Sequence, residues 1–369
     1  MGWISSARTH LKTGVSMSVF FIIARCILAA VLITFCVSCA SQETHTGSTS
    51  VSNDTINEPS STTNITPTTE PPVEPVSALD ILKKQQGVLS VEQVYVNTYD
   101  NIDLSSYPAE YLQTIEEMID GVVNKTLSYT IIYEVGNVKV QAFCSLPADY
   151  LENPRPLVLY CRGGNGSFSA IDESLTAMYS YYCDDIVLAT QYRETSPGTG
   201  KDEFGGADIQ DVLFWIERAK QLTFADTERI YMLGESRGGM ELCLALRDAP
   251  AGIVKAAASV SGVYDLAALY EAREDMRAML TRRIGGTPET VPEEYALRSA
   301  ITFVDQINTP LLIVHSTGDE RVPYSQAKTF ADAFEKSGKI FDFWTRENNA
   351  HSIASPEEMK SIIAWLENY

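Results

Sequence analysis

The strongest constraint on the fold is an alternation of short apolar segments with amphipathic ones, which begins near residue 157 and runs to the end of the chain. Short apolar runs are typical of strands buried on both faces of a sheet, and amphipathic linkers of helical length typically connect parallel strands by right-handed crossovers. The predicted strands are 157–160, 186–190, 230–233, 256–260, 310–316 and 340–344. The predicted helices are 170–182, 208–222, 238–248, 324–336 and 356–367.

Two further segments complete the predicted architecture. Residues 129–146 alternate between apolar and polar side chains around Gly136-Asn137, a tight-turn pair, which predicts a β-hairpin. An antiparallel hairpin that leads into a mostly parallel sheet with helices on both faces is typical of the α/β-hydrolase fold. Residues 264–305 are too long for an ordinary crossover, so we expect a helical insertion, or cap, over the carboxyl edge of the sheet.

A serine lies between glycines where a predicted strand gives way to a helix. The sequence Gly234-Glu235-Ser236-Arg237-Gly238 fits the G-x-S-x-G nucleophile elbow, in which a strained turn exposes the serine hydroxyl. A side chain at 234 or 238 would collide with the neighbouring strand or helix, so glycine suits both positions. In this strand–turn–helix context the pattern predicts that Ser236 is a catalytic nucleophile.

A serine nucleophile needs a base, and the chain has only four histidines. His10 and His45 lie in N-terminal segments of different character, and His315 lies inside a predicted strand, where we expect a packed core residue. His351 follows the last predicted strand and precedes the final helix. It is the predicted base.

The acid that orients the base should follow the next-to-last strand. Two carboxylates lie in that loop, and Asp319, directly after a glycine, is better placed to reach the imidazole than Glu320, which we expect to face solvent. The order Ser236, Asp319, His351 is the order of α/β-hydrolase triads.

A hydrolase of this kind also needs an oxyanion hole. One expected donor is the backbone N–H of Arg237, the residue after the nucleophile. The second should come from the loop CRGGNGSF at 161–168, where glycines allow a close approach to a substrate carbonyl. The sequence leaves three readings of that loop open: the N–H of Gly163 or a neighbour, the Arg162 guanidinium, or a simple turn.

Four segments together resemble the catalytic domain of the prolyl oligopeptidase family of serine peptidases, over about residues 128–369. They are GESRGG, the loop QYRETSPGTGKDEFGGADIQDV, GDERVP and NNAHS. The most specific part is the arrangement of Arg193, Phe204, Gly205, Gly206 and Asp208. The resemblance implies a serine hydrolase that cleaves peptide or ester bonds.

The chain departs from that family in several ways. Its peptidases usually carry a large N-terminal β-propeller, for which residues 79–127 are too few. Several members have a tyrosine that assists the oxyanion where this chain has Arg162, and Arg193-Glu194 replaces a more usual Arg-Gly. We expect a peptidase. The alternatives are a carboxylesterase or deacetylase acting on a small ester or a cell-surface glycan, and a non-catalytic hydrolase-like surface protein. We expect the substrate pocket to form from 264–305 and the N-terminal helices.

The N-terminal part of the sequence predicts that the protein is exported from the cytoplasm. Residues 1–39, beginning at Met1 or Met17, contain a basic start and an apolar run too short to span a bilayer comfortably, followed by small residues and Cys39. This pattern resembles a bacterial lipoprotein signal with lipidation at Cys39, which would place the protein in the cell envelope. Plain secretion with cleavage near Ala40 and an uncleaved membrane anchor are the alternatives. Residues 40–78 are rich in Ser, Thr and Pro and predict a disordered tether, and 79–127 predicts a helical segment.

Composition excludes further classes of protein. The net charge of −20, without a concentration of Lys and Arg, argues against a nucleic-acid partner. The cysteines outside the signal have no paired spacing, so we expect no metal or other cofactor. We expect these cysteines to be small buried core residues, and one disulfide between two of them is the alternative. The four cysteines are Cys144, Cys161, Cys183 and Cys243.

Overall fold

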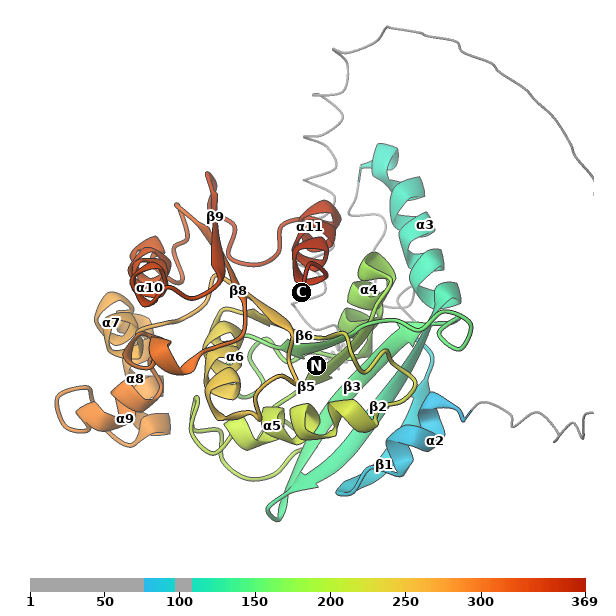
Figure 1. Cartoon of the computed structure of the whole chain (residues 1–369), viewed down its shortest axis with the longest axis horizontal. Coiled ribbons are helices and arrows are strands. Elements are labelled where there is room, and N and C mark those ends of the chain that lie inside the picture. Colours follow the sequence, from blue (N-terminus) through green and yellow to red (C-terminus); the bar gives the residue numbers. More distant parts are fainter. Residues whose placement is uncertain (1–75, 97–107) are drawn as a thin grey trace, which may run out of the picture.

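The computed structural model describes residues 76–96 and 108–369, so the predicted signal, Cys39 and nearly all of the tether lie outside the described residues. Within these ranges the strands form one nine-stranded sheet in the order β1-β2-β3-β5-β4-β6-β7-β8-β9 (Figure 1). The pairs β1–β2, β2–β3 and β3–β5 are antiparallel, and every other neighbouring pair is parallel. This is the predicted α/β-hydrolase sheet.

The element bounds agree closely with the sequence pattern from residue 126 onward. The strands are β1 Val88–Val94, β2 Thr126–Val135, β3 Val138–Pro147, β4 Leu157–Cys161, β5 Ile186–Thr190, β6 Ile230–Glu235, β7 Ala256–Val260, β8 Leu311–Ser316 and β9 Phe341–Arg346. The helices outside the insertion are α2 Ala78–Lys83, α3 Ala109–Lys125, α4 Glu173–Cys183, α5 Ile209–Arg218, α6 Arg237–Asp248, α10 Tyr324–Ser337 and α11 Pro356–Leu366, with short 3-10 turns at Ala219–Gln221, Ala300–Thr302 and Val304–Gln306. The predicted hairpin, the six later strands and the five predicted helices are all confirmed.

The segment 79–127 is not helical throughout, which corrects the prediction. Gly87 takes a φ of +90° after α2, and the chain then forms β1, which pairs with β2 at the edge of the sheet. The helical prediction rested on the apolar spacing of 78–86 and 106–123, where α2 and α3 do form, whereas Val88–Val94 between them pairs with β2 as a strand. The predicted fifth strand, 230–233, is therefore β6 of the chain.

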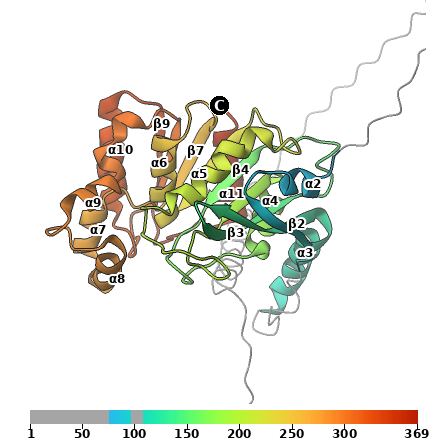
Figure 2. The same cartoon turned by 90° about the horizontal axis from the view of Figure 1, so that it is seen from below.

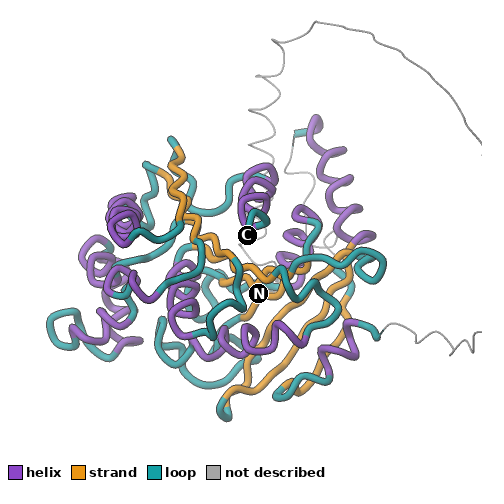
Figure 3. Tube along the Cα trace, viewed as in Figure 1, coloured by secondary structure: helices purple, strands orange, loops and turns teal. Residues whose placement is uncertain are grey.

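Helices cover both faces of the sheet (Figures 2 and 3). One buried apolar cluster joins one face of the sheet to α2, α5, α6 and α10, with Trp215 and Phe330 among its large members. A second cluster joins the other face to α4 and α11, and includes Met178 and Trp365. Because apolar side chains of the central strands are buried on both sides, the strands appear in the sequence as continuous apolar runs rather than alternating ones.

The predicted insertion after β7 is also confirmed. It contains α7 Leu266–Ala272, α8 Glu274–Ile284 and α9 Pro292–Leu297, which gather beside α10 at one end of the molecule (Figure 1). Asp265 caps the first of these helices by accepting a hydrogen bond from the Ala268 N–H, and Gly285 ends the second with a φ of +98°. These local signals separate short helices that together form the cap.

The four described cysteines are free thiols, three of them buried and Cys183 half-buried, so no disulfide joins them. Across 76–96 and 108–369, no group of three or more metal-ligating side chains comes together. None of the helices in these ranges combines the length and apolar character needed to cross a bilayer.

Candidate active site

Ser236 occupies a strained turn between β6 and α6. Its φ of 58° and ψ of −121° place a side-chain-bearing residue in a region that residues other than glycine seldom adopt. The flanking glycines are required by space: a Cβ at Gly234 would lie 2.3 Å from the Gly238 carbonyl oxygen, and one at Gly238 would lie 1.9 Å from the Cys161 carbonyl oxygen. The sequence therefore holds Ser236 at the carboxyl end of β6 in the geometry of a nucleophile elbow.

Asp319 and His351 meet at the neighbouring strand ends. Asp319 follows β8 and His351 follows β9, and His351 Nδ1 lies 2.8 Å from Asp319 Oδ2 and 2.9 Å from Oδ1. A carboxylate only accepts hydrogen bonds, so Nδ1 carries the proton and Nε2 remains free to accept one. Burial alone would raise the pKa of Asp319, but the hydrogen bond from His351 and further backbone donors lower it to about 2. Asp319 is therefore a carboxylate at any pH near neutral.

The alternative acid, Glu320, and the other histidine of this region, His315, lie where the sequence predicts. Glu320 is exposed, and His315 is fully buried in β8. His315 Nε2 donates to the Val322 carbonyl at 2.9 Å and lies 3.6 Å from Asp319 Oδ2, so this core histidine packs against the acid loop.

A cavity of about 1000 Å³ opens over the elbow. Ser236, Arg237, Gly163, Arg162 and His351 all line it. Among the described contacts none joins Ser236 Oγ to His351 by a hydrogen bond, which is common in unliganded sites whose catalytic bonds tighten on binding.

The cap supplies one wall of this cavity, as expected, but the N-terminal helices do not. No described residue of α2 or α3 lines it; the opposite wall comes instead from the loop after β4 and the start of α4, including Phe168 and Leu175. The reason is topological: α2 packs on β1, and α3 packs on β2 and α4, at the far antiparallel end of the sheet.

Arg162 does not present its guanidinium to the cavity as an oxyanion donor. The group is fully buried, with Nε donating to the Gln191 carbonyl at 2.8 Å and Nη1 to the Gly163 carbonyl at 2.9 Å. Nη2 donates to the Gly166 carbonyl at 2.8 Å and to the Thr195 hydroxyl at 2.9 Å. Its donors are thus engaged by carbonyls of its own loop and by Gln191 and Thr195 of the segment after β5. The alternative of a side-chain oxyanion donor is not supported.

Two backbone N–H groups remain well placed for that task. Arg237 is the first residue of α6, so its N–H has no partner within the helix and lies at the positive end of the helix dipole. Gly163 lies directly against the nucleophile, because a Cβ added to it would be 3.2 Å from Ser236 Cβ. Both residues line the cavity.

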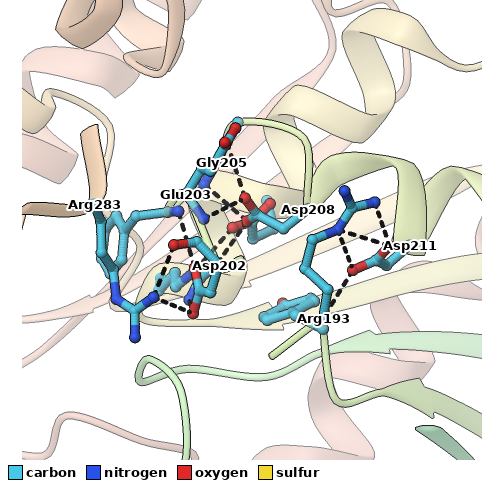
Figure 4. A network of polar contacts seen from close by, with 12 residues as sticks. Arg193, Asp202, Glu203, Gly205, Asp208, Asp211 and Arg283 are labelled. Carbon is cyan, nitrogen blue, oxygen red and sulfur yellow. Dashed lines mark hydrogen bonds and ion pairs between the residues drawn. The ribbon is translucent and has the colours of Figure 1, made fainter. Parts of the chain in front are cut away.

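The Arg237 side chain turns into a buried ionic network with three acidic side chains. Figure 4 shows two of them, Asp202 and Asp208. Arg237 Nη1 and Nη2 each lie 2.8 Å from one oxygen of Asp202, Nη2 also lies 2.6 Å from Asp208, and Nε lies 2.8 Å from Glu241. The guanidinium also lies over the Phe204 ring, 4.6 Å from its centroid. Burial and the neighbouring Asp208 raise the pKa of Glu241 above its ordinary value, and the Arg237 guanidinium opposes that rise.

This network explains the most specific part of the family resemblance. Asp208 accepts hydrogen bonds from the backbone N–H groups of Gly205 and Gly206 and binds Arg237, while Arg193 pairs with Asp211 through Nη2 at 2.7 Å. The motif residues thus fold the 193–208 loop against the helix that begins at the nucleophile.

Glu235 is a site residue that the sequence analysis did not single out. Its carboxylate is buried, accepts from the Tyr179 hydroxyl at 2.6 Å and the Tyr160 hydroxyl at 3.3 Å, and accepts from the Ile353 N–H at 3.2 Å. It therefore ties the residue before the nucleophile to the loop that carries His351. A glutamate inside the elbow motif was the available signal, but its partner lies 118 positions away.

Comparison with known proteins identifies the domain. Residues 188–369 match the model of the prolyl oligopeptidase family. Over 243 residues the chain is 28% identical to the uncharacterized peptidase YtmA of Bacillus subtilis (strain 168), a match that covers 65% of this chain and 93% of YtmA. It is 27% identical over 235 residues to the acylamino-acid-releasing enzyme of Arabidopsis thaliana, covering 58% of this chain and 30% of that enzyme.

Solved structures share the fold. The acylaminoacyl peptidase of Pyrococcus horikoshii superposes with a TM-score of 0.56 at 20% identity, covering 68% of this chain and 42% of that one. The chain thus spans nearly all of YtmA but less than half of the larger relatives. The solved structures show a shared fold, and the family match assigns residues 188–369 to the prolyl oligopeptidase family of serine peptidases.

Proposed function

We propose that this protein cleaves peptide bonds with Ser236 as nucleophile, His351 as general base and Asp319 as the acid that orients the base. The observation that carries the proposal is the 2.8 Å contact of His351 Nδ1 with Asp319, at the wall of the same cavity that Ser236 lines. A buried carboxylate with a lowered pKa fixes the imidazole tautomer and stabilises the imidazolium that forms during the reaction.

The reaction follows from these groups. Ser236 Oγ attacks the substrate carbonyl carbon as its proton passes to His351 Nε2, and the carbonyl oxygen becomes an oxyanion held by the N–H groups of Arg237 and Gly163. His351 then gives that proton to the leaving amine, which leaves an acyl-enzyme. Water, activated by the same histidine, attacks the acyl-enzyme and restores Ser236.

The cavity wall favours a substrate with an apolar side chain near the scissile bond. The side chains that line it include Phe168, Val263, Leu269, Met276, Met279 and Val322. Two methionines in such a wall adapt to side chains of different shape, so we propose a preference for apolar residues as a class rather than for one residue.

Substrate comparison tests the proposal. The purified protein should hydrolyse short peptide p-nitroanilides with an apolar residue before the scissile bond, and Ser236→Ala should remove this activity. Fast hydrolysis of p-nitrophenyl acetate with no detectable cleavage of any peptide amide would instead indicate an esterase. Peptide cleavage that survives Ser236→Ala would contradict the assignment of the nucleophile.

We also propose, from the sequence alone, that the protein is exported and lipidated at Cys39, so that residues 40–78 tether the domain to the cell envelope. The test is fractionation with metabolic labelling by a fatty acid. Wild-type protein should carry the label in the membrane fraction, and Cys39→Ser should lose it; an unlabelled, released wild type would support plain secretion instead.

A further inference from the structure

The two proposed oxyanion donors come from different parts of the chain. The Arg237 N–H belongs to the start of α6, whereas the Gly163 N–H belongs to the loop between β4 and α4. That loop has an irregular path, with φ of +73° at Gly164 and +49° at Gly166. A hole made of two such segments works only if their separation is fixed.

One carboxylate binds both segments. Asp202 is fully buried, and its two oxygens each receive a hydrogen bond from the Arg237 guanidinium at 2.8 Å. The same Oδ2 accepts the backbone N–H of Gly166 at 3.0 Å. Burial opposes the charged form of Asp202, but Arg237 outweighs it and holds the pKa of this carboxyl well below its usual range.

Two guanidinium groups also hold the 163–166 loop, by donating hydrogen bonds to its carbonyls. Arg237 Nη1 also donates to the Gly164 carbonyl at 3.2 Å, and Arg162 donates to the carbonyls of Gly163 and Gly166 at 2.9 and 2.8 Å. The peptide groups around the second donor are therefore held from the elbow through Arg237 and from β4 through Arg162.

We infer that Asp202 is a positioning residue that, by binding the Arg237 guanidinium and the Gly166 N–H together, sets the distance between the two N–H groups of the oxyanion hole. The inference rests on the proposed function. It also gives the arginine after the nucleophile a role for its side chain: the residue whose N–H faces the oxyanion aligns the opposite donor as well. Arg162, where several family members have a tyrosine, supports the loop instead of contacting the oxyanion.

A change in the distance between the two donors should affect the oxyanion that forms during the reaction more than it affects the bound substrate. A donor displaced by a fraction of an ångström binds the neutral substrate almost as well but stabilises the oxyanion less. Loss of a whole donor costs about 100- to 1000-fold in kcat, so a displaced donor should cost about 10- to 100-fold.

The test compares Asp202→Asn with Asp211→Asn. Both replace a fully buried aspartate that pairs with an arginine in the same network region (Figure 4), but the Asp211 side chain binds Arg193 and contacts neither Arg237 nor the 163–166 loop. For each variant, kcat and KM are measured on a peptide p-nitroanilide, together with the inhibition constant of an apolar boronic acid, whose tetrahedral adduct with the serine mimics the oxyanion. Thermal unfolding is followed in parallel.

For Asp202→Asn we expect kcat to fall about 10- to 100-fold with KM changed less than about threefold, and boronate affinity to fall by the same factor as kcat. The shape of the pH–rate profile should not change. Asp211→Asn should lose thermal stability but keep kcat and boronate affinity. Equal kinetic losses in the two variants, or a loss confined to KM, would overturn the inference.

Thr195→Val provides a second route if Asp202→Asn does not fold. The Thr195 hydroxyl accepts from Arg162 and donates to the Gly166 carbonyl at 3.0 Å, so its loss loosens the same loop without removing a charge. We expect a several-fold parallel decrease of kcat and boronate affinity, and unchanged values would overturn the inference. A wild-type protein that neither cleaves substrate nor binds the boronic acid would overturn the proposed function and the inference with it, whereas an active wild type separates the two.

Discussion

At the scale of single residues, the neighbouring carboxylates Asp319 and Glu320 should respond very differently to substitution. Asp319→Asn should lower kcat about 1000- to 10,000-fold, because an amide in this place favours the wrong tautomer of His351. Glu320→Gln is the matched control, since Glu320 is exposed and adjacent in the chain. Steady-state kinetics on one peptide substrate decides the matter, and a severe loss in the Glu320 variant with a mild one in the Asp319 variant would move the acid to Glu320.

Asp319 should also make stability depend on pH. Its folded pKa of about 2 lies below the ordinary value of 3.8, so the folded state favours the charged form and the contribution is present above pH 4. The difference corresponds to about 2 kcal/mol of unfolding free energy, which is lost as the pH falls through about 2. Urea unfolding of wild type and Asp319→Asn should differ by about that amount at pH 6 and converge toward pH 2. A constant gap between the two curves would contradict the account.

The individual site residues differ in how far the sequence could reveal them. Ser236 is visible because its requirements are local: the glycines that make room for it stand two positions away on either side. Asp202 and Glu235 act through partners that lie 35 and 118 positions away, which no local pattern encodes. Arg162 misleads because a guanidinium beside glycines resembles a ligand donor, and only the fold brings the carbonyls that engage it.

The elbow is the element on which the catalytic geometry depends. Gly238→Ala would place a Cβ 1.9 Å from the Cys161 carbonyl oxygen, and since backbone must then move, we expect the folded state to lose about 3 kcal/mol or more. Gly252→Asn is the control, because that glycine has a φ of +80° that asparagine tolerates and has open space around it. Chemical denaturation measures both, and an alanine variant of wild-type stability would show that the turn is looser than described.

Among the elements, those with a single strong pattern were predicted and one with a mixed pattern was not. The parallel strands are buried on both faces, so their apolar runs are unmistakable. The edge strand β1 buries only Val91 fully, so it lacks a continuous apolar run, and it lies between two segments with helical apolar spacing. Pairing with β2, a contact between residues about 40 positions apart, decides the outcome and could not be seen locally.

The whole molecule places a helical cap opposite a loop, with the elbow between them. If the cap wall receives an apolar substrate side chain, Met279→Lys should lower kcat/KM for a peptide with phenylalanine before the scissile bond by more than about tenfold. Hydrolysis of an acetyl ester, which does not fill the wall, should change little. Arg277→Lys on the same helix is the control, since Arg277 is not among the cavity-lining residues. Equal losses on both substrates would indicate a damaged fold rather than a lost contact.

The central claim is that Ser236 is the nucleophile of this domain, and covalent labelling tests it most directly. The wild-type protein, treated with a fluorophosphonate and digested, should carry one adduct, located by mass spectrometry on the peptide that contains Ser236. Ser236→Ala should carry none, and Asp319→Asn should react far more slowly. An adduct on another residue, or labelling that persists in Ser236→Ala, would contradict the account.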